Sequence, residues 1–144
     1  MDAENVTRLR RVIGRLARLL NAAPVSENLT PTQASVLGIV AYRGPVGMTE
    51  LADIEGLNPT MLSRVVAKLV DEGLVTRLPN PADQRAVQLQ ATDTGREVQL
   101  RIIRSRTDTV ARILDGLSPD ATVALLDALP ALEALAEGLR TTKN

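Results

Sequence analysis

The sequence predicts a mostly α-helical fold that carries one small β-hairpin. Proline, glycine and capping residues divide the 144 residues into six segments of helical periodicity and one pair of short strands. Two of the helical segments are short and are joined by a tight glycine turn, and the hairpin follows them directly. Longer amphipathic segments lie before and after this central part, so we expect a single domain over residues 1–144.

The first and last helical segments are amphipathic. Apolar residues recur at steps of three and four through residues 4–20, and again after the cap Ser118-Pro119. Pro130 lies inside the last segment and should kink it. Both apolar stripes flank a domain that already has a core. We therefore expect residues 4–29 and 93–144 to supply dimerisation helices, the alternative being that they pack within one chain.

The second segment begins with a strong start signal. Thr30 stands at the N-cap, Pro31 at the first helical position and Gln33 three residues after the cap, which is the pattern of a capping box. The helix is predicted to run to Arg43. A fifth segment, from near Thr92 to about Asp115, follows the hairpin.

A helix-turn-helix is predicted between Met48 and Leu69. Ala52 is small enough to let two helices cross closely, and Gly56 tolerates the positive φ that the turn requires. The second helix, 58–73, starts at an Asn-Pro cap and presents one apolar stripe toward the first helix. Its opposite face carries Thr60, Ser63, Arg64 and Lys68. These side chains suit the major groove, since Arg reads guanine with two hydrogen bonds and Ser or Thr bonds bases or phosphate; the alternative is a solvated helix face.

The hairpin, 74–92, completes a winged helix-turn-helix. Residues 74–78 read as a strand, 79–84 as a turn-rich tip, and 86–91 as the return strand. Arg85 near the tip has the charge to enter a minor groove, and Asp83 is placed to fix its rotamer by a charge-assisted bond. The alternative is a surface salt bridge. Arg77 is a further candidate for DNA, unless it pairs with an acid beside the wing.

The composition of the chain excludes several classes of function. Lys plus Arg and Asp plus Glu are 17 each, so the net charge is zero, unlike most nucleic-acid binders. The chain has no Cys and no His, which removes the usual catalytic pairs, the thiol redox switches and the common zinc ligands. We therefore expect no enzyme activity, no cofactor and no metal, in a soluble cytoplasmic protein.

The run 58–77 resembles the recognition helix and first wing strand of MarR-family regulators. Residues 83–87, followed by Ala91-Thr92 and Gly95, are similar to the wing signature of that family, and the order of segments matches along nearly the whole chain. The sequence departs from the pattern at Gln84, where a second basic residue is common, and at Ala91, where Leu is common.

The resemblance implies a homodimer whose winged parts bind two halves of a pseudo-palindromic double-stranded operator. It also implies a cleft for a small molecule, whose walls here would be the first, second and fifth segments. Arg15, Tyr42 and Arg43 are the candidates for an anionic or phenolic effector; the alternative is a solvated arginine face and a half-buried tyrosine. We thus expect a ligand-responsive transcriptional repressor. The alternative function is a protein-interaction module that has lost DNA binding. It is suggested by the zero net charge and by the excess of acidic over basic residues in the segment 45–92.

Overall fold

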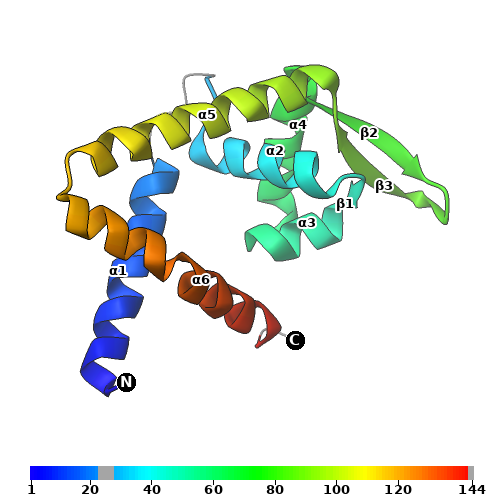
Figure 1. The fold of residues 1–144 in the computed structure, drawn as a ribbon. Helices are drawn as coiled ribbons and strands as arrows, with labels where there is room; N and C mark the ends of the chain where they lie inside the picture. Colours follow the sequence, from blue (N-terminus) through cyan, green and yellow to red (C-terminus); the bar gives the residue numbers. More distant parts are fainter. Residues whose placement is uncertain (23–27, 143–144) are drawn as a thin grey trace. The chain divides into compact units, whose positions relative to one another are not determined.

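The computed structural model describes residues 1–22 and 28–142, and it confirms a mostly helical fold with a small antiparallel sheet (Figure 1). The chain divides into two compact units, Met1–Arg106 and Thr107–Asn144. In chain order the elements are α1 (Ala3–Ala22), α2 (Pro31–Arg43), β1 (Val46–Gly47), α3 (Met48–Glu55), α4 (Pro59–Asp71), β2 (Val75–Asn80), β3 (Asp83–Ala91), α5 (Asp93–Asp115) and α6 (Pro119–Thr141).

The helix starts follow the predicted capping chemistry. The Thr30 hydroxyl accepts from the Gln33 N–H at 3.2 Å, and the Gln33 side chain accepts from the Thr30 N–H at 3.0 Å, so both halves of the capping box of α2 form. Ser118 caps α6 through a single bond, in which its hydroxyl accepts from the Ala121 N–H at 3.2 Å. The helix α6 continues through Pro130.

The core of the first unit lies between α2, α3, α4 and the sheet. Its fully enclosed side chains come from each of these elements, and the first turns of α5 close one side with Val98 and Ile102. The largest side chains with less than 2% exposure are Leu37, Leu51, Leu62, Leu69, Leu89, Val36, Val40, Val46 and Val66. Burial of this kind supplies most of the free energy that holds α4 against α3.

The sheet has the strand order β1-β3-β2 and is antiparallel throughout. Two features differ from the sequence prediction. The two-residue strand β1 was not predicted, and the hairpin strands extend farther toward the tip, leaving only residues 81–82 between them. Pro79 pairs with Val87 in the ladder. Proline is tolerated at this position because β2 is an edge strand, where the missing N–H need not donate to another strand.

In the second unit, most large apolar residues of α6 are exposed in the single chain. Those that retain 37% or more of their surface are Val123, Leu125, Leu126, Leu129, Leu132, Leu135 and Leu139. Within the part of the chain that the structure describes, none of the helices is both long and apolar enough to cross a membrane. The same residues hold no cluster of His, Cys, Asp or Glu suited to a metal ion.

Candidate nucleic-acid interface

The turn between α3 and α4 is built as the sequence predicted. Gly56 adopts φ 66° and ends α3, with its N–H directed to the Ala52 carbonyl. The next amide, of Leu57, also donates to the Ala52 carbonyl at 3.1 Å. Ala52 itself packs against the core. A left-handed residue at this point reverses the chain in a single step, so α3 and α4 form a helix-turn-helix.

The first turn of α4 is fixed by its cap. Asn58 accepts a hydrogen bond from the Met61 N–H at 2.8 Å, and Pro59 occupies the first helical position. One face of the helix is anchored in the core by Leu62, Val66 and Leu69. The opposite face is open to solvent and carries all four predicted contact residues: Thr60, Ser63, Arg64 and Lys68.

The two cations on this open face differ in their surroundings. No hydrogen bond or ion pair joins the Arg64 guanidinium to another described residue. The Lys68 ammonium lies 2.8 Å from the carboxylate of Glu72, the C-cap residue of α4. Glu72, first by accepting a hydrogen bond and second by its charge, raises the pKa of Lys68 above its usual value. Arg64 is therefore ready to bind a ligand, whereas Lys68 must first leave its partner.

The hairpin tip is held by two side chains that bind the backbone. Asn80 accepts from the Ala82 N–H at 2.9 Å, and Asp83 accepts from the Arg85 N–H at 3.0 Å. The predicted bond between the Asp83 carboxylate and the Arg85 guanidinium is not among the described ion pairs; the carboxylate instead accepts from the Arg85 backbone. Asp83 thus shapes the tip, and the Arg85 side chain extends from it without a described partner.

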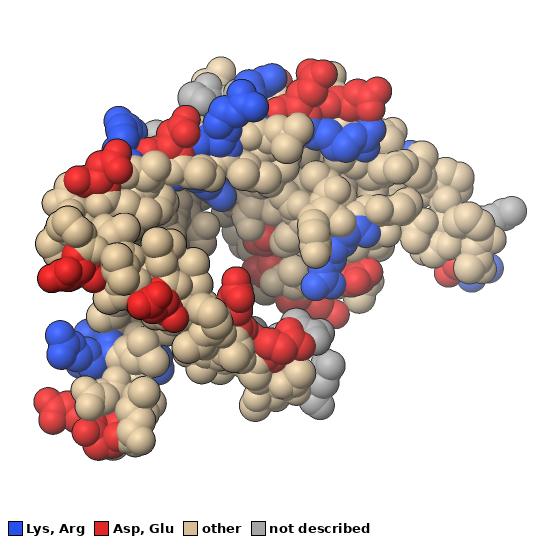
Figure 2. All heavy atoms as spheres, viewed as in Figure 1, with Lys and Arg blue, Asp and Glu red and all other residues tan. Residues whose placement is uncertain are grey.

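The rest of the hairpin carries little charge. Arg77 on β2 is exposed and stands opposite Leu89 in the ladder. Among the described residues no ion pair joins Arg77 to an acidic side chain, which was the alternative that the sequence suggested. Figure 2 shows the visible face of the hairpin as mostly uncharged, with basic and acidic side chains at its tip.

A clasp of four residues, Gly73, Leu74, Thr92 and Gly95, joins the base of the hairpin to the end of α4 and the start of α5. The Thr92 hydroxyl donates to the Gly73 carbonyl at 2.6 Å, and the Thr92 N–H donates to the Leu74 carbonyl at 3.0 Å. The same hydroxyl accepts from the Gly95 N–H at 3.0 Å and so caps α5. Thr92 can take this role because it directly precedes the helix, which begins at Asp93. The clasp thus ties the base of the hairpin to the end of α4.

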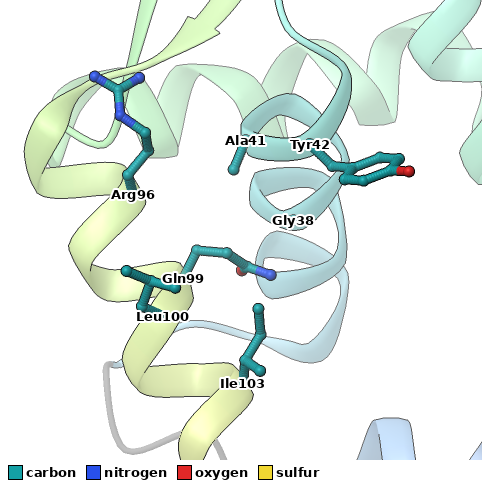
Figure 3. Close-up of a pocket in the computed structure, with 7 residues that line it drawn as sticks. All are labelled: Gly38, Ala41, Tyr42, Arg96, Gln99, Leu100 and Ile103. Carbon is teal, nitrogen blue, oxygen red and sulfur yellow. The ribbon is translucent and has the colours of Figure 1, made fainter.

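A pocket of about 270 Å³ lies between α2 and α5 in the first unit (Figure 3). Of the three predicted effector residues only Tyr42 lines it, and Tyr42 is 89% exposed with its ring directed away from Gln99. Arg43 instead approaches Glu50 on α3 at 3.9 Å, and Arg15 is an exposed residue of α1 that does not line the pocket.

The α5 wall of this pocket was not predicted residue by residue. Arg96, Gln99, Leu100 and Ile103 form one stripe at helical spacing, and this spacing is the signal that could have identified them. Arg96 donates to the Ala91 carbonyl at 2.7 Å and pairs with Asp93. The Gln99 carbonyl oxygen is buried and has no hydrogen-bond partner among the described residues.

A helix-turn-helix followed by a clasped hairpin defines a winged-helix DNA-binding protein, and the comparisons with known proteins agree. The family model described as "MarR family" matches residues 29–87. The HTH-type transcriptional regulator Mb0904 of Mycobacterium bovis is 30% identical over 136 residues, which are 94% of this chain and 95% of that protein. The chain belongs to the MarR family, whose members are transcriptional regulators and not enzymes.

Solved structures of similar fold cover most of the chain. RV1404 from Mycobacterium tuberculosis is similar with a TM-score of 0.77 and 29% identity, over 95% of both chains. The PcaV transcriptional regulator from Streptomyces coelicolor, solved in complex with its natural ligand, has a TM-score of 0.60 and 25% identity. That likeness covers 89% of this chain and 91% of PcaV.

Proposed function

We propose that this MarR-family regulator is a cytoplasmic repressor that binds a pseudo-palindromic operator as a homodimer. In each subunit α4 lies in the major groove and the hairpin tip reaches the adjacent minor groove. The observation that carries the proposal is the open face of α4, where Thr60, Ser63 and Arg64 are exposed and the Arg64 guanidinium has no described partner. The hydrogen bonds of the clasp support a fixed spacing between this face and Arg85.

The test is a DNA titration with the intact protein. A duplex selected from a library with a random 20-base-pair core, and a scrambled duplex of the same composition, are titrated at several salt concentrations. We expect the selected duplex to bind at least about 1000-fold more tightly at physiological salt. Equal binding of the two duplexes would contradict sequence-specific DNA recognition.

The proposed dimer rests on exposed apolar surface and on charge. In α1, Val6, Val12, Leu16, Leu19 and Leu20 each keep 44% or more of their surface, which is costly for a helix that remains in water. The same helix carries an exposed basic face of Arg8, Arg11, Arg15 and Arg18. In α6 the acids are Asp120, Asp127, Glu133 and Glu137. Opposite charge favours packing of α1 from one copy against α6 from a second.

Sedimentation equilibrium tests this pairing. We expect a wild-type dimer that persists in 1 M NaCl, because apolar burial holds it and salt screens only the charges. The variant Leu16→Glu should be monomeric and should lose specific DNA binding, since one subunit alone spans one half-site. A folded Leu16→Glu dimer would contradict the role of α1.

We also propose that the pocket between α2 and α5 binds the effector. Its volume of about 270 Å³ suits a molecule of one substituted ring, since benzene fits a protein cavity of about 150 Å³. Arg96 already uses two of its donors on the Ala91 carbonyl and on Asp93, whose charge offsets its own, whereas the buried Gln99 oxygen lacks a donor. The pocket therefore favours a phenolic ligand over a simple anion. The similar PcaV transcriptional regulator was solved in complex with its natural ligand, which supports an effector site here.

Phenol and benzoate make a matched pair of probes for this site. We expect phenol at millimolar concentration to raise the thermal midpoint and benzoate to have less effect. In Gly38→Ala a new methyl group would lie 3.0 Å from the Gln99 amide nitrogen. This variant should lose the phenol response and still bind DNA. A phenol response that is the same in Gly38→Ala would exclude Gln99 as its acceptor.

A protein-interaction module without DNA binding remains the second candidate, and one observation favours it. Lys68, the second cation of the open face of α4, already has an intramolecular partner in Glu72. This candidate predicts that the random library yields no enriched sequence and that Arg85→Ala leaves the weak residual DNA binding unchanged.

A further inference from the structure

Met61 is a long apolar side chain exposed on the helix that we propose to read DNA. It keeps 51% of its surface, whereas Leu62, next along the chain, keeps 1%. Exposed apolar surface on a helix that buries its other large apolar side chains has an unfavourable hydration free energy in the free protein. Among the described residues, Met61 belongs neither to the core cluster nor to the side chains packed against it, so core packing does not account for it.

The position of Met61 on α4 is well defined. It is the third residue of the helix, and its N–H is bound by Asn58 at 2.8 Å, which fixes the first turn. Arg64 and Lys68 follow at steps of three and four, so the three side chains form one stripe on the open face. In helix-turn-helix proteins the N-terminal residues of the second helix are those that reach base edges. Met61 therefore lies where base contacts are made.

We propose that Met61 is a specificity-determining residue that packs against the 5-methyl group of a thymine in each half-site. The proposal rests on the proposed function of α4 as the reading helix. Thymine is the only base that presents an apolar group in the major groove. A thioether side chain has no hydrogen-bond donor and adapts its shape to small apolar partners. Its contact with the thymine methyl group therefore favours thymine over the other bases.

The spacing along α4 makes the proposal more specific. Met61 and Arg64 are three residues apart, which is about 4.5 Å along the helix axis, and base pairs are stacked about 3.4 Å apart. Arg64 favours guanine through two hydrogen bonds. Each half-site should therefore contain a thymine within about two base pairs of the guanine that Arg64 contacts.

The experiment begins with the full-length wild-type dimer and a library of duplexes with a random 20-base-pair core. The selected duplex is then resynthesised with deoxyuridine in place of one thymine at a time, in both half-sites together. This change removes only the methyl group. At one thymine position the wild type should bind about fourfold more weakly per half-site, the value for one buried carbon group. The variant Met61→Ala should bind the thymine duplex and the deoxyuridine duplex with equal affinity.

Ile54→Ala is the matched control. Ile54 is 40% exposed on α3 and is not on the open face of α4, so its loss removes a similar apolar side chain without touching the proposed contact. This control should keep the wild-type response to deoxyuridine. Thermal unfolding of both variants checks that they are folded.

The possible outcomes distinguish a failure of the role of Met61 from a failure of the proposed DNA-reading function of α4. An enriched site that has no methyl-sensitive thymine would overturn the role of Met61 alone. So would a deoxyuridine response that is as large in Met61→Ala as in the wild type. A library without any enriched sequence would overturn the reading function of α4 and the role of Met61 with it.

Discussion

The Leu74 carbonyl oxygen occupies the space that a side chain at position 95 would need. A Cβ built on Gly95 would lie 2.0 Å from that oxygen, far inside van der Waals contact. The close approach brings the first turn of α5 against the chain between α4 and β2, and the Thr92 hydroxyl binds both Gly73 and Gly95 there. Glycine at position 95 is therefore a structural requirement of the clasp.

Gly95→Ala should destabilise the protein by about 1–3 kcal/mol, the usual result of forcing extra atoms into a packed site. Gly138→Ala is the control, because nothing lies within 4 Å of the added Cβ and alanine favours a helix interior. Denaturant unfolding measures both. Equal midpoints for Gly95→Ala and the wild type would show that the backbone relaxes at the clasp.

Arg64→Ala should weaken binding to the selected duplex by about 1–3 kcal/mol per half-site and relax base preference at one position. Arg64→Lys keeps the charge but lacks the planar pair of donors. It should therefore retain affinity for scrambled DNA and lose most of the discrimination. Fluorescence anisotropy with both duplexes measures the difference. If Arg64→Lys discriminates as well as the wild type, Arg64 contacts phosphate and not a base.

The salt dependence of binding should report how many cations meet phosphate. Three or four contacts per subunit, drawn from Arg64, Lys68, Arg77 and Arg85, give a slope of log K against log salt of about −5 to −7 for the dimer. Arg85→Ala removes one contact per subunit, so the slope should become shallower by about 2. An unchanged slope would indicate that the hairpin tip does not reach the DNA backbone.

Glu72→Gln should strengthen DNA binding. The substitution releases Lys68 from the carboxylate that now lies 2.8 Å away, so the lysine no longer exchanges one anion for another when DNA arrives. We expect a few-fold gain in affinity that shrinks as salt rises. Asp71→Asn removes the same charge without breaking an ion pair, and it should have a smaller effect. Equal gains for the two variants would indicate that only net charge matters.

The stability of the protein should vary little between about pH 6 and 9. The chain has no His, the side chain whose ordinary pKa falls near this range. The pKa of Lys68 is raised by Glu72, so the stabilisation from that pair is fully present below the pKa of a free lysine. It is lost only as the pH rises through the higher value of the folded state. Thermal midpoints measured across this range test the prediction, which a steep transition near pH 7 would contradict.

The features that the sequence predicted well are those fixed by local chemistry. The capping box of Thr30 and Gln33 and the left-handed turn at Gly56 each depend on residues within a few positions of one another. The apolar stripe of α4 could also be predicted from the sequence, because a helix that packs on one side repeats its buried residues at steps of three and four.

The features that it did not predict depend on distant partners. The strand β1 exists because Val46 pairs with Leu89, and a two-residue strand has no pattern of its own. The bond from the Arg85 N–H to the Asp83 carboxylate depends on the conformation of the tip backbone, which the sequence pattern alone does not fix. The unpartnered oxygen of Gln99 is a consequence of how α5 packs beside α2, which no local motif encodes.

The clasp and the pocket share the first two turns of α5. Gly95 and Gln99 are four residues apart, which is about 6 Å along one helix, and a hydrogen-bonded helix moves over such a distance as a stiff rod. At Gly95 there is no free volume against Leu74 to absorb a displacement. A displacement of α5 at the pocket would therefore be passed to the chain between α4 and β2, and it would change the direction of the hairpin relative to α4.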